Sequence, residues 1–321
     1  MKAIFSKKHL VHIFLLVLLL VAGCSGPKAS APELTEGLAT ATVPNMPLDG
    51  YLFFRQSQPT LLPGMLLNLP SDVTVQSVAV WVVPAGYTEI IGAVVTFTSA
   101  QDAANLFPLI PNRNELWKYL AANNIFLVMG SGGSAEALKN AITAEQFVSL
   151  STAAPDAWDL MQRFPSQPAS KPPVVGFVRM EDRLFAFIQK YAKGAFDEST
   201  VSALKMAKIE MAAVAMYSNK ILQVTDLLSP ANLKDAGLGG IMIAKSSYPG
   251  FAISAALGPL ASRMSLEKTD VDGNKAYYRA MDAPGGQKVL LLLNNSGQYI
   301  QVTAATNLER TQQLYRWLWV P

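Results

Sequence analysis

Apolar runs separated by short polar turns recur along most of this chain, and their order repeats. Two such runs joined by a turn containing Asn or Gly predict a β-hairpin, because these residues tolerate the positive φ of tight hairpin turns. A segment with apolar residues at helical spacing then follows. This pattern of strand, turn, strand and helix is predicted over residues 119–142, 211–236 and 289–319, with a looser copy over 78–110.

The helix starts in this pattern are marked by side chains that can accept hydrogen bonds from the free N–H groups of a first helical turn. The predicted N-caps are Ser99, Ser134, Ser229 and Thr306. Glu309 follows Thr306 at the spacing of a capping box. Two further helices are predicted over 183–193 and 249–264, and an Asp-Gly turn at 272–273 precedes a predicted strand over 275–281.

These elements predict an α+β fold of antiparallel β-hairpins, each followed by a helix, with the helices covering one face of the sheet. Four prolines between Pro165 and Pro173 favour an extended, semi-rigid spacer. We therefore predict two similar α+β domains, over residues 49–164 and 174–321, joined by a linker over 165–173. The alternative is that the proline-rich stretch is a long loop inside one domain.

The N-terminal segment differs in character from the rest of the chain. Lys2, Lys7 and Lys8 precede an apolar stretch of 13 residues, Leu10–Ala22. A bilayer-spanning helix needs about 20 apolar residues, so this stretch is too short to span and has the organisation of a signal peptide over residues 1–23. Small residues then lead directly into Cys24, the single cysteine of the chain.

The run from Leu20 to Cys24 resembles the lipobox of bacterial lipoproteins. The resemblance implies cleavage before Cys24, a diacylglycerol on its thiol and a further fatty acid such as palmitate on its amino group. Two or more acyl chains hold a protein on a membrane essentially permanently. The implied location is outside the cytoplasm of a bacterium, on the cell membrane or the outer membrane. The alternative is an ordinary secretory signal with an unrelated cysteine.

Residues 24–48 are rich in Ala, Pro, Thr, Gly and Ser and predict a flexible tether behind the anchor. Removal of the signal peptide also changes the charge of the chain. Three of its 26 basic residues lie in the signal, so 23 remain against 23 acidic residues. A neutral chain offers no broad electrostatic footprint for nucleic acid, and no nucleic-acid partner is expected.

Both histidines, His9 and His12, lie in the signal peptide, and the one cysteine is the predicted lipid site. The mature chain therefore has no Ser-His-Asp or Cys-His catalysis, no zinc site built on His and Cys, and no disulfide. No cofactor is predicted. Stability must come from the apolar core.

A glycine-rich segment between a predicted strand and a predicted helix is a candidate anion site. Its residues are Gly130, Gly132, Gly133 and Ser134. Backbone N–H groups at a helix N-terminus can hold an anion, but the segment lacks the Lys of a phosphate-binding loop and the spacing of a dinucleotide fingerprint. A glycine-rich connection without a ligand is the favoured interpretation.

Two further motifs have both a chemical and a purely structural interpretation. Asp270, Asp272 and Asn274 resemble the opening of a calcium loop, but the later ligand positions do not match, and a hairpin turn is favoured. Ser202 and Lys205 match the Ser-x-x-Lys spacing in which a lysine activates a serine. The partner motifs of such hydrolases are not intact, so this remains an alternative.

We therefore predict a membrane-anchored lipoprotein with a non-catalytic binding or scaffolding role at the cell envelope. Its partners would be the membrane, through Cys24, and an envelope protein or a small-molecule ligand. One alternative is a solute-binding lipoprotein of a transport system, which would have a polar cleft between two domains. The other is a histidine-free hydrolase using Ser202 and Lys205 or a pair of carboxylates.

Overall fold

The computed structural model describes residues 42–44, 52–57, 75–85, 88–110, 116–164, 174–179, 207–217, 239–263, 265–283 and 287–318. The strands are β1 (Thr42–Pro44), β2 (Leu52–Ser57), β3 (Val75–Ala85), β4 (Thr88–Phe97), β5 (Leu116–Ala121), β6 (Asn124–Met129), β7 (Phe147–Ser149), β8 (Val174–Arg179), β9 (Ile209–Tyr217), β10 (Gly239–Ser246), β11 (Glu267–Val271), β12 (Asn274–Ala283), β13 (Gln287–Ser296) and β14 (Tyr299–Ala305). The helices are α4 (Ala100–Leu106), the 3₁₀ helix η1 (Phe107–Leu109), α5 (Gly133–Thr143), α6 (Leu150–Ala153), α7 (Pro155–Met161), α12 (Gly250–Arg263) and α13 (Leu308–Leu318).

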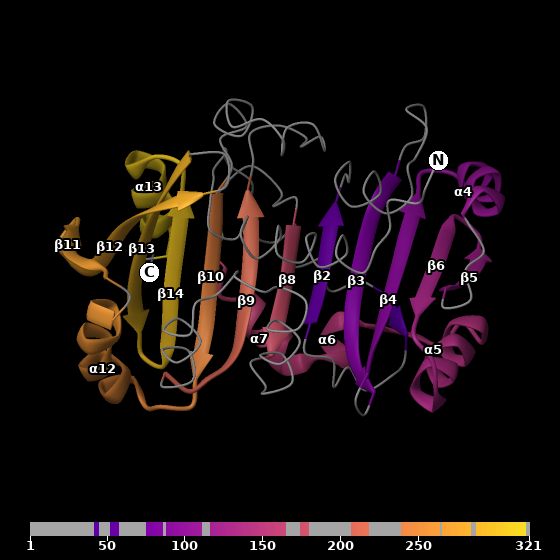
Figure 1. Ribbon diagram of the computed structural model, residues 1–321, viewed down its shortest axis with the longest axis horizontal. Coiled ribbons are helices and arrows are strands. Elements are labelled where there is room, and N and C mark those ends of the chain that lie inside the picture. The colour runs from indigo at the N-terminus through magenta and orange to yellow at the C-terminus, as the bar shows by residue number, and fades with distance from the viewer. Residues whose placement is uncertain are drawn as a thin grey trace.

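A single antiparallel sheet crosses the whole molecule (Figure 1). Its 12 strands lie in the order β11-β12-β13-β14-β10-β9-β8-β2-β3-β4-β6-β5. β1 and β7 form a separate two-stranded sheet. Helices pack beside the large sheet, and the predicted α+β class is confirmed.

The strand order is the same on either side of the central β2–β8 pair. From β2 outward it is β2-β3-β4-β6-β5, and from β8 outward it is β8-β9-β10-β14-β13, with the hairpin β11–β12 added at that end. α4 and α12 occupy matching places, as do α5 and α13, and each pair lies at diagonally opposite corners in Figure 1. Because β2 and β8 are antiparallel, with Phe54 opposite Gly176, a twofold rotation perpendicular to the sheet would relate the two halves.

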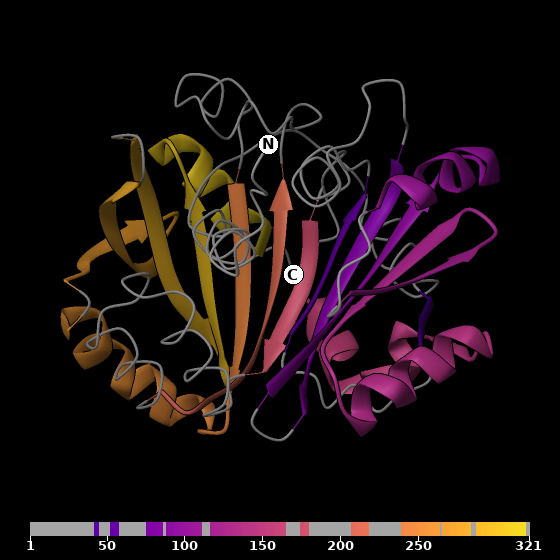
Figure 2. The ribbon, with the colours of Figure 1, turned by 45° about the vertical axis from the view of Figure 1, so that its right-hand side comes forward.

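Helices cover both faces of the sheet, so the prediction of one covered face is wrong. Alternate residues of the same strands belong to different clusters, because successive side chains of a strand point to opposite faces. Trp81 lies in a cluster with Leu138 of α5, whereas Val78 lies in another cluster with Leu106 of α4. Figure 2 shows α5, α6 and α7 lying on one side of the sheet.

The larger cluster is continuous across the two halves. It contains Phe126 of β6, Phe177 of β8, Tyr217 of β9 and Leu314 of α13, all at most 5% exposed. α7, which follows the first half in sequence, contacts β8, β9 and β10 of the second. Arg163, just after α7, lies over the ring of Tyr299 of β14, at 3.8 Å from its centroid. The two predicted domains thus share a sheet and a core, and the linker over 165–173 lies outside the described residues.

One glycine of the sheet is required by this core. Gly92 of β4 lies directly opposite Trp81 of β3. A Cβ atom at position 92 would stand 2.3 Å from Cε2 and Nε1 of the Trp81 indole. The absence of a side chain at Gly92 therefore lets the largest buried side chain of the core lie flat against its neighbouring strand.

The predicted hairpin–helix units have mixed outcomes. A hairpin followed by a helix occurs as β3–β4–α4, β5–β6–α5 and β13–β14–α13, at the predicted places. The hairpin predicted to join 211–218 to 221–225 is wrong, because β9 pairs with β8 along one edge and with β10 along the other. The predicted turn at Asp272 and Gly273 joins β11 to β12 and is confirmed.

The predicted N-caps also have mixed outcomes. Ser99 caps α4, since its Oγ accepts a hydrogen bond from the Asp102 N–H at 3.1 Å. The N-cap predicted at Ser134 is wrong, because α5 begins at Gly133 with Gly132 as its N-cap. The N-cap predicted at Thr306 is wrong by one residue. The Asn307 side chain accepts a hydrogen bond from the Arg310 N–H at 2.9 Å, so the capping box with Glu309 does not form. Ser229 and the helix predicted over 183–193 lie outside the described residues.

The predicted tether ends earlier than residue 48. Thr42 pairs with Ser149 and Pro44 with Phe147, which places β1 within the folded body. β1 also contacts α5 and α6. The helix predicted over 249–264 is confirmed as α12. Among all helices in the described ranges, none is long and apolar enough to cross a membrane.

Candidate apolar binding site

α12 is held against the end of the β13–β14 hairpin by a close backbone contact. A Cβ atom on Gly250 would stand 2.8 Å from the Cα of Gly297, so glycine is needed at the start of this helix. Ser254 donates a hydrogen bond to the Gly250 carbonyl at 3.0 Å and accepts one from the Asn295 amide at 2.9 Å. These contacts position α12 on the face of the sheet opposite α13.

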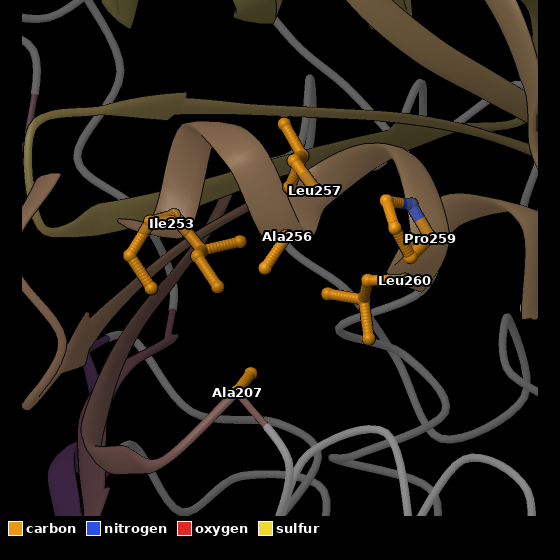
Figure 3. A pocket seen from close by; sticks show the side chains of 7 residues that line it. Ala207, Ile253, Ala256, Leu257, Pro259 and Leu260 are labelled. Carbon is orange, nitrogen blue, oxygen red and sulfur yellow. The ribbon is translucent and has the colours of Figure 1, made fainter. Parts of the chain in front are cut away.

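A cavity of about 140 Å³ lies between α12 and the sheet (Figure 3). Its described lining is Ala207, Ile253, Ala256, Leu257, Pro259, Leu260 and Ile300. Ile253, Ala256 and Leu260 recur at helical spacing and point from α12 toward Ala207, as Figure 3 shows. Ile253 and Leu257 are buried, whereas Ala256 and Pro259 are exposed and form the rim.

The floor of this cavity is fixed by hydrogen bonds behind it. The Ser246 hydroxyl is buried and donates to the Ala207 carbonyl at 2.6 Å. The Ser247 N–H donates to the Lys208 carbonyl at 3.0 Å. Ala207 is therefore held in place by the end of β10 rather than by the helix that faces it.

The described lining consists of alkyl side chains alone. A hollow of this size lined by Leu and Ile can accept a small apolar molecule or group. Such a lining can bury a hydrocarbon segment, but it has no group to orient a polar substrate or to move a proton. The chemistry that this site supports is binding of an apolar group.

Two buried ionisable groups lie on the other face of the sheet. Burial raises the pKa of the Tyr217 phenol well above its ordinary value. Burial lowers the pKa of the Arg310 guanidinium on α13 to about 10. Neither residue lines the cavity beneath α12.

The predicted anion site is an open loop in the structure. Gly132 has φ +94°, and no atom lies within 4 Å of a Cβ built at Gly132 or Gly133. Glu136 lies in the first turn of α5 and pairs with Lys139 at 2.6 Å. An acidic side chain thus already occupies the favourable end of the helix dipole, and the arrangement does not favour a second anion. Gly130 lies before this loop, and Ser134 is exposed in the first turn of α5.

The predicted cation site is occupied by a hairpin turn. The Asp270 carboxylate accepts a hydrogen bond from the Gly273 N–H at 2.7 Å. The Asp272 carboxylate accepts a hydrogen bond from the Arg316 guanidinium of α13 at 2.5 Å, and this hydrogen bond lowers the pKa of the Asp272 carboxyl. Asn274 begins β12 and pairs with Val271. Within the described ranges, no three His, Cys, Asp or Glu side chains come together as metal ligands would.

Three other predicted site residues lie outside the described ranges. These are Cys24, Ser202 and Lys205. The cavity beneath α12 was not predicted. Its signal in the sequence is the composition of residues 250–263, which are almost entirely apolar although the helix lies at the surface.

Comparisons with known proteins assign this chain to no family. No protein-family model matches the chain, and no curated protein matches it. One solved structure that aligns with the chain is described as an N-terminal dehydratase from the difficidin assembly line. The identity is 10%, the alignment covers 91% of this chain and 92% of that one, and the TM-score is 0.14. A TM-score this low shows no shared fold.

Proposed function

We propose that this protein is a bacterial lipoprotein, anchored outside the cytoplasm by acyl chains on Cys24, with a non-catalytic role in binding at the cell envelope. The observation that carries the binding role is the cavity beneath α12, whose described lining is wholly alkyl. Its ligand is an apolar group of a few carbon atoms, or the end of a longer hydrocarbon chain. The absence of histidine from residues 24–321 agrees with a role other than catalysis.

The solute-binding alternative is less well supported. Solute binders of the kind considered close two domains over a polar cleft, whereas β2 and β8 join the two halves of this protein by five consecutive residue pairs of one sheet. Those cavity-lining residues that the structure describes also come from the second half. The hydrolase alternative rests on Ser202 and Lys205, whose surroundings lie outside the described residues.

The anchor is tested by mass spectrometry of the protein extracted from the membranes of its host. A diacylglyceryl mass on an N-terminal Cys24 supports the proposal. A bare thiol at Cys24, or an intact signal peptide on cytosolic material, would reject it.

The binding role is tested by thermal unfolding of the mature chain, starting at residue 24 with Cys24→Ser, in a series of n-alkanols. A ligand that binds the folded state raises the melting temperature by mass action. We expect the rise to grow with alkyl length and then level off once the cavity is filled. Ala256→Leu, at the rim, should remove it, whereas Ala255→Leu, one residue away and outside the lining, should leave it unchanged. An equal response of both variants would reject the cavity as the binding site.

A further inference from the structure

The outer face of α12 is apolar over its first two turns and beyond, with the exposed Ser262 as a polar residue on the same stripe near the end of the helix. Phe251 is 79% exposed, the most exposed of the large apolar side chains in the described part of the chain. Ala255 and Pro259 follow it at four-residue spacing and are also exposed. These three residues lie along one stripe of the helix, beside the rim of the cavity.

The matching helix of the other half shows that the fold does not require this stripe. α4 occupies the place that corresponds to α12, yet its exposed face carries Gln101 and Asn105, which hydrogen-bond to each other at 2.8 Å. α4 still buries Ala103 and Leu106 against the sheet. The seven residues of α4 thus carry no such stripe, although Leu109 of η1, directly after α4, is 68% exposed.

The residues before α12 are of the kind found at membrane–water interfaces. Tyr248 is half-buried, and the exposed Lys208 places its amine 5.0 Å from the centroid of the Tyr248 ring. Tyrosine joins an apolar ring to a polar hydroxyl, and lysine can bury its stem while its amine stays in water or among lipid headgroups. Tyr248, Lys208 and Phe251 thus combine an apolar anchor with interfacial neighbours.

The place where the chain enters the body points to the same edge of the molecule. β1, the first described element, contacts α5 and α6, and these helices lie with α12 along the lower edge in Figures 1 and 2. α13, whose exposed residues include Arg316, lies at the upper edge. The lower edge is thus the one that an N-terminal anchor would hold nearest to a membrane.

The length of the intervening segment keeps the body close to the membrane. Residues 25–41 separate Cys24 from β1. The tether predicted from the sequence would have, at this length, a root-mean-square span of roughly 20–25 Å. A surface tethered at such a distance meets the bilayer at high effective concentration, so a small apolar face suffices to hold it there.

We propose that the outer face of α12 docks on the lipid bilayer, with Phe251 inserted at the headgroup boundary and the lower edge of the molecule turned toward the membrane. This inference rests on the proposed lipid anchor at Cys24. Docking would bring the rim of the cavity, at Ala256 and Pro259, next to the acyl chains of the bilayer. A membrane lipid chain would then be the nearest apolar group for the cavity to bind.

The test uses the full lipidated protein in vesicles of phosphatidylethanolamine and phosphatidylglycerol that contain spin-labelled lipid. Because Cys24 is acylated and is the single cysteine, a cysteine introduced at position 255 would be the sole thiol open to a fluorescent label. Ala104→Cys is the matched control, since Ala104 is an exposed alanine on α4. We expect quenching by spin-labelled lipid to be several-fold stronger at position 255 than at position 104.

Phe251→Ser should reduce the quenching at position 255 to the level at position 104, while Leu109→Ser, another exposed apolar residue, should leave it unchanged. Circular dichroism checks that both variants fold. Equal quenching at the two labelled positions, or quenching indifferent to Phe251→Ser, overturns the docking. Labelling of the chain without any introduced cysteine reveals a free Cys24 instead, so a failure of the anchor is distinguished from a failure of the docking.

Discussion

A methyl group at position 92 has no room in the folded protein. In Gly92→Ala the new Cβ would stand 2.3 Å from two atoms of the Trp81 indole and 2.6 Å from a third. Carbon atoms in contact are about 3.5–4.0 Å apart, so the ring must move by roughly 1 Å. Trp81 is 1% exposed and surrounded by close-packed core, which resists such a movement.

We expect this substitution to lower the free energy of unfolding by about 1–3 kcal/mol, the usual cost of an overpacked core. Urea denaturation followed by far-ultraviolet circular dichroism measures the change. Gly133→Ala is the control, because its Cβ meets no atom within 4 Å at the first position of α5. Removing backbone freedom from the unfolded chain at such a site stabilises by about 0.4–1 kcal/mol.

A double-mutant cycle separates the clash from other effects of the alanine. Trp81→Leu removes the ring that the new methyl group would strike, so Gly92→Ala should cost much less in that background. Residues in contact typically show coupling of about 0.5–3 kcal/mol. If Gly92→Ala costs the same with Trp81 and with Leu at that position, the steric argument is refuted.

Four further predictions concern the rest of the molecule. Lys118→Met should lower the free energy of unfolding by about 1–3 kcal/mol in urea titrations, because the Lys118 amine donates to the carbonyls of Phe107, at the start of η1, and of Ile110, just after its end, the latter at 2.7 Å. Asn294→Leu should raise the melting temperature, since this side chain is 1% exposed, no group in the described part of the protein hydrogen-bonds to its amide, and a buried unpaired amide costs about 1–3 kcal/mol; a lower melting temperature would count against it. The pKa of Asp272 is lowered by its hydrogen bond from Arg316. The stability that this pair contributes is therefore present above the ordinary aspartate pKa of about 3.9 and is lost as pH falls through the lower folded value. Asp272→Asn should destabilise the protein at neutral pH and have no effect in strong acid, which acid-unfolding curves would record. Calorimetry should give one unfolding transition for both halves, because β2 and β8 share one sheet and one core crosses them; two transitions would contradict this.

The local elements were largely predictable from the sequence, because they depend on neighbouring residues. The turns at Asn123 and Gly297 and the cap at Ser99 each depend on local backbone preferences. The start of α13 shows the limit of such signals. Thr306 and Asn307 are adjacent and both can cap a helix, and the burial of Thr306 beneath α13 decides in favour of Asn307.

The sequence also contained a signal that both faces of the sheet are buried. Residues 78–83 and 90–95 are almost unbroken apolar runs, and a strand covered on one face would alternate instead. The strand order could not be predicted from the sequence, because it depends on pairings between distant segments. The partner of β9 is β10, whose first residue lies more than 20 residues further along the chain, and no local pattern indicates which edge it will take.

The cavity depends on the same long-range placement. Ala207 and Ile253 are 46 residues apart in the sequence, and they face each other because α12 follows β10 while Ala207 precedes β9. Composition could have identified α12 as unusual, but it could not have supplied the opposite wall. A site formed by side chains without charge or polarity also leaves no motif of the kind that marks metal or catalytic centres.

The correspondence between α4 and α12 gives the strongest reason to regard the second half as the functional one. Both helices follow the third strand of their half, and both bury apolar residues on the same face of the sheet. α4 does so with seven helical residues and a polar outer face, whereas α12 uses 14 residues, is apolar on its outer face and encloses a cavity beneath. The additional length and the exposed Phe251 contribute nothing that the fold needs at this place, since α4 shows that the sheet is covered without them. In the docking proposed above, the bilayer would cover the exposed ring of Phe251.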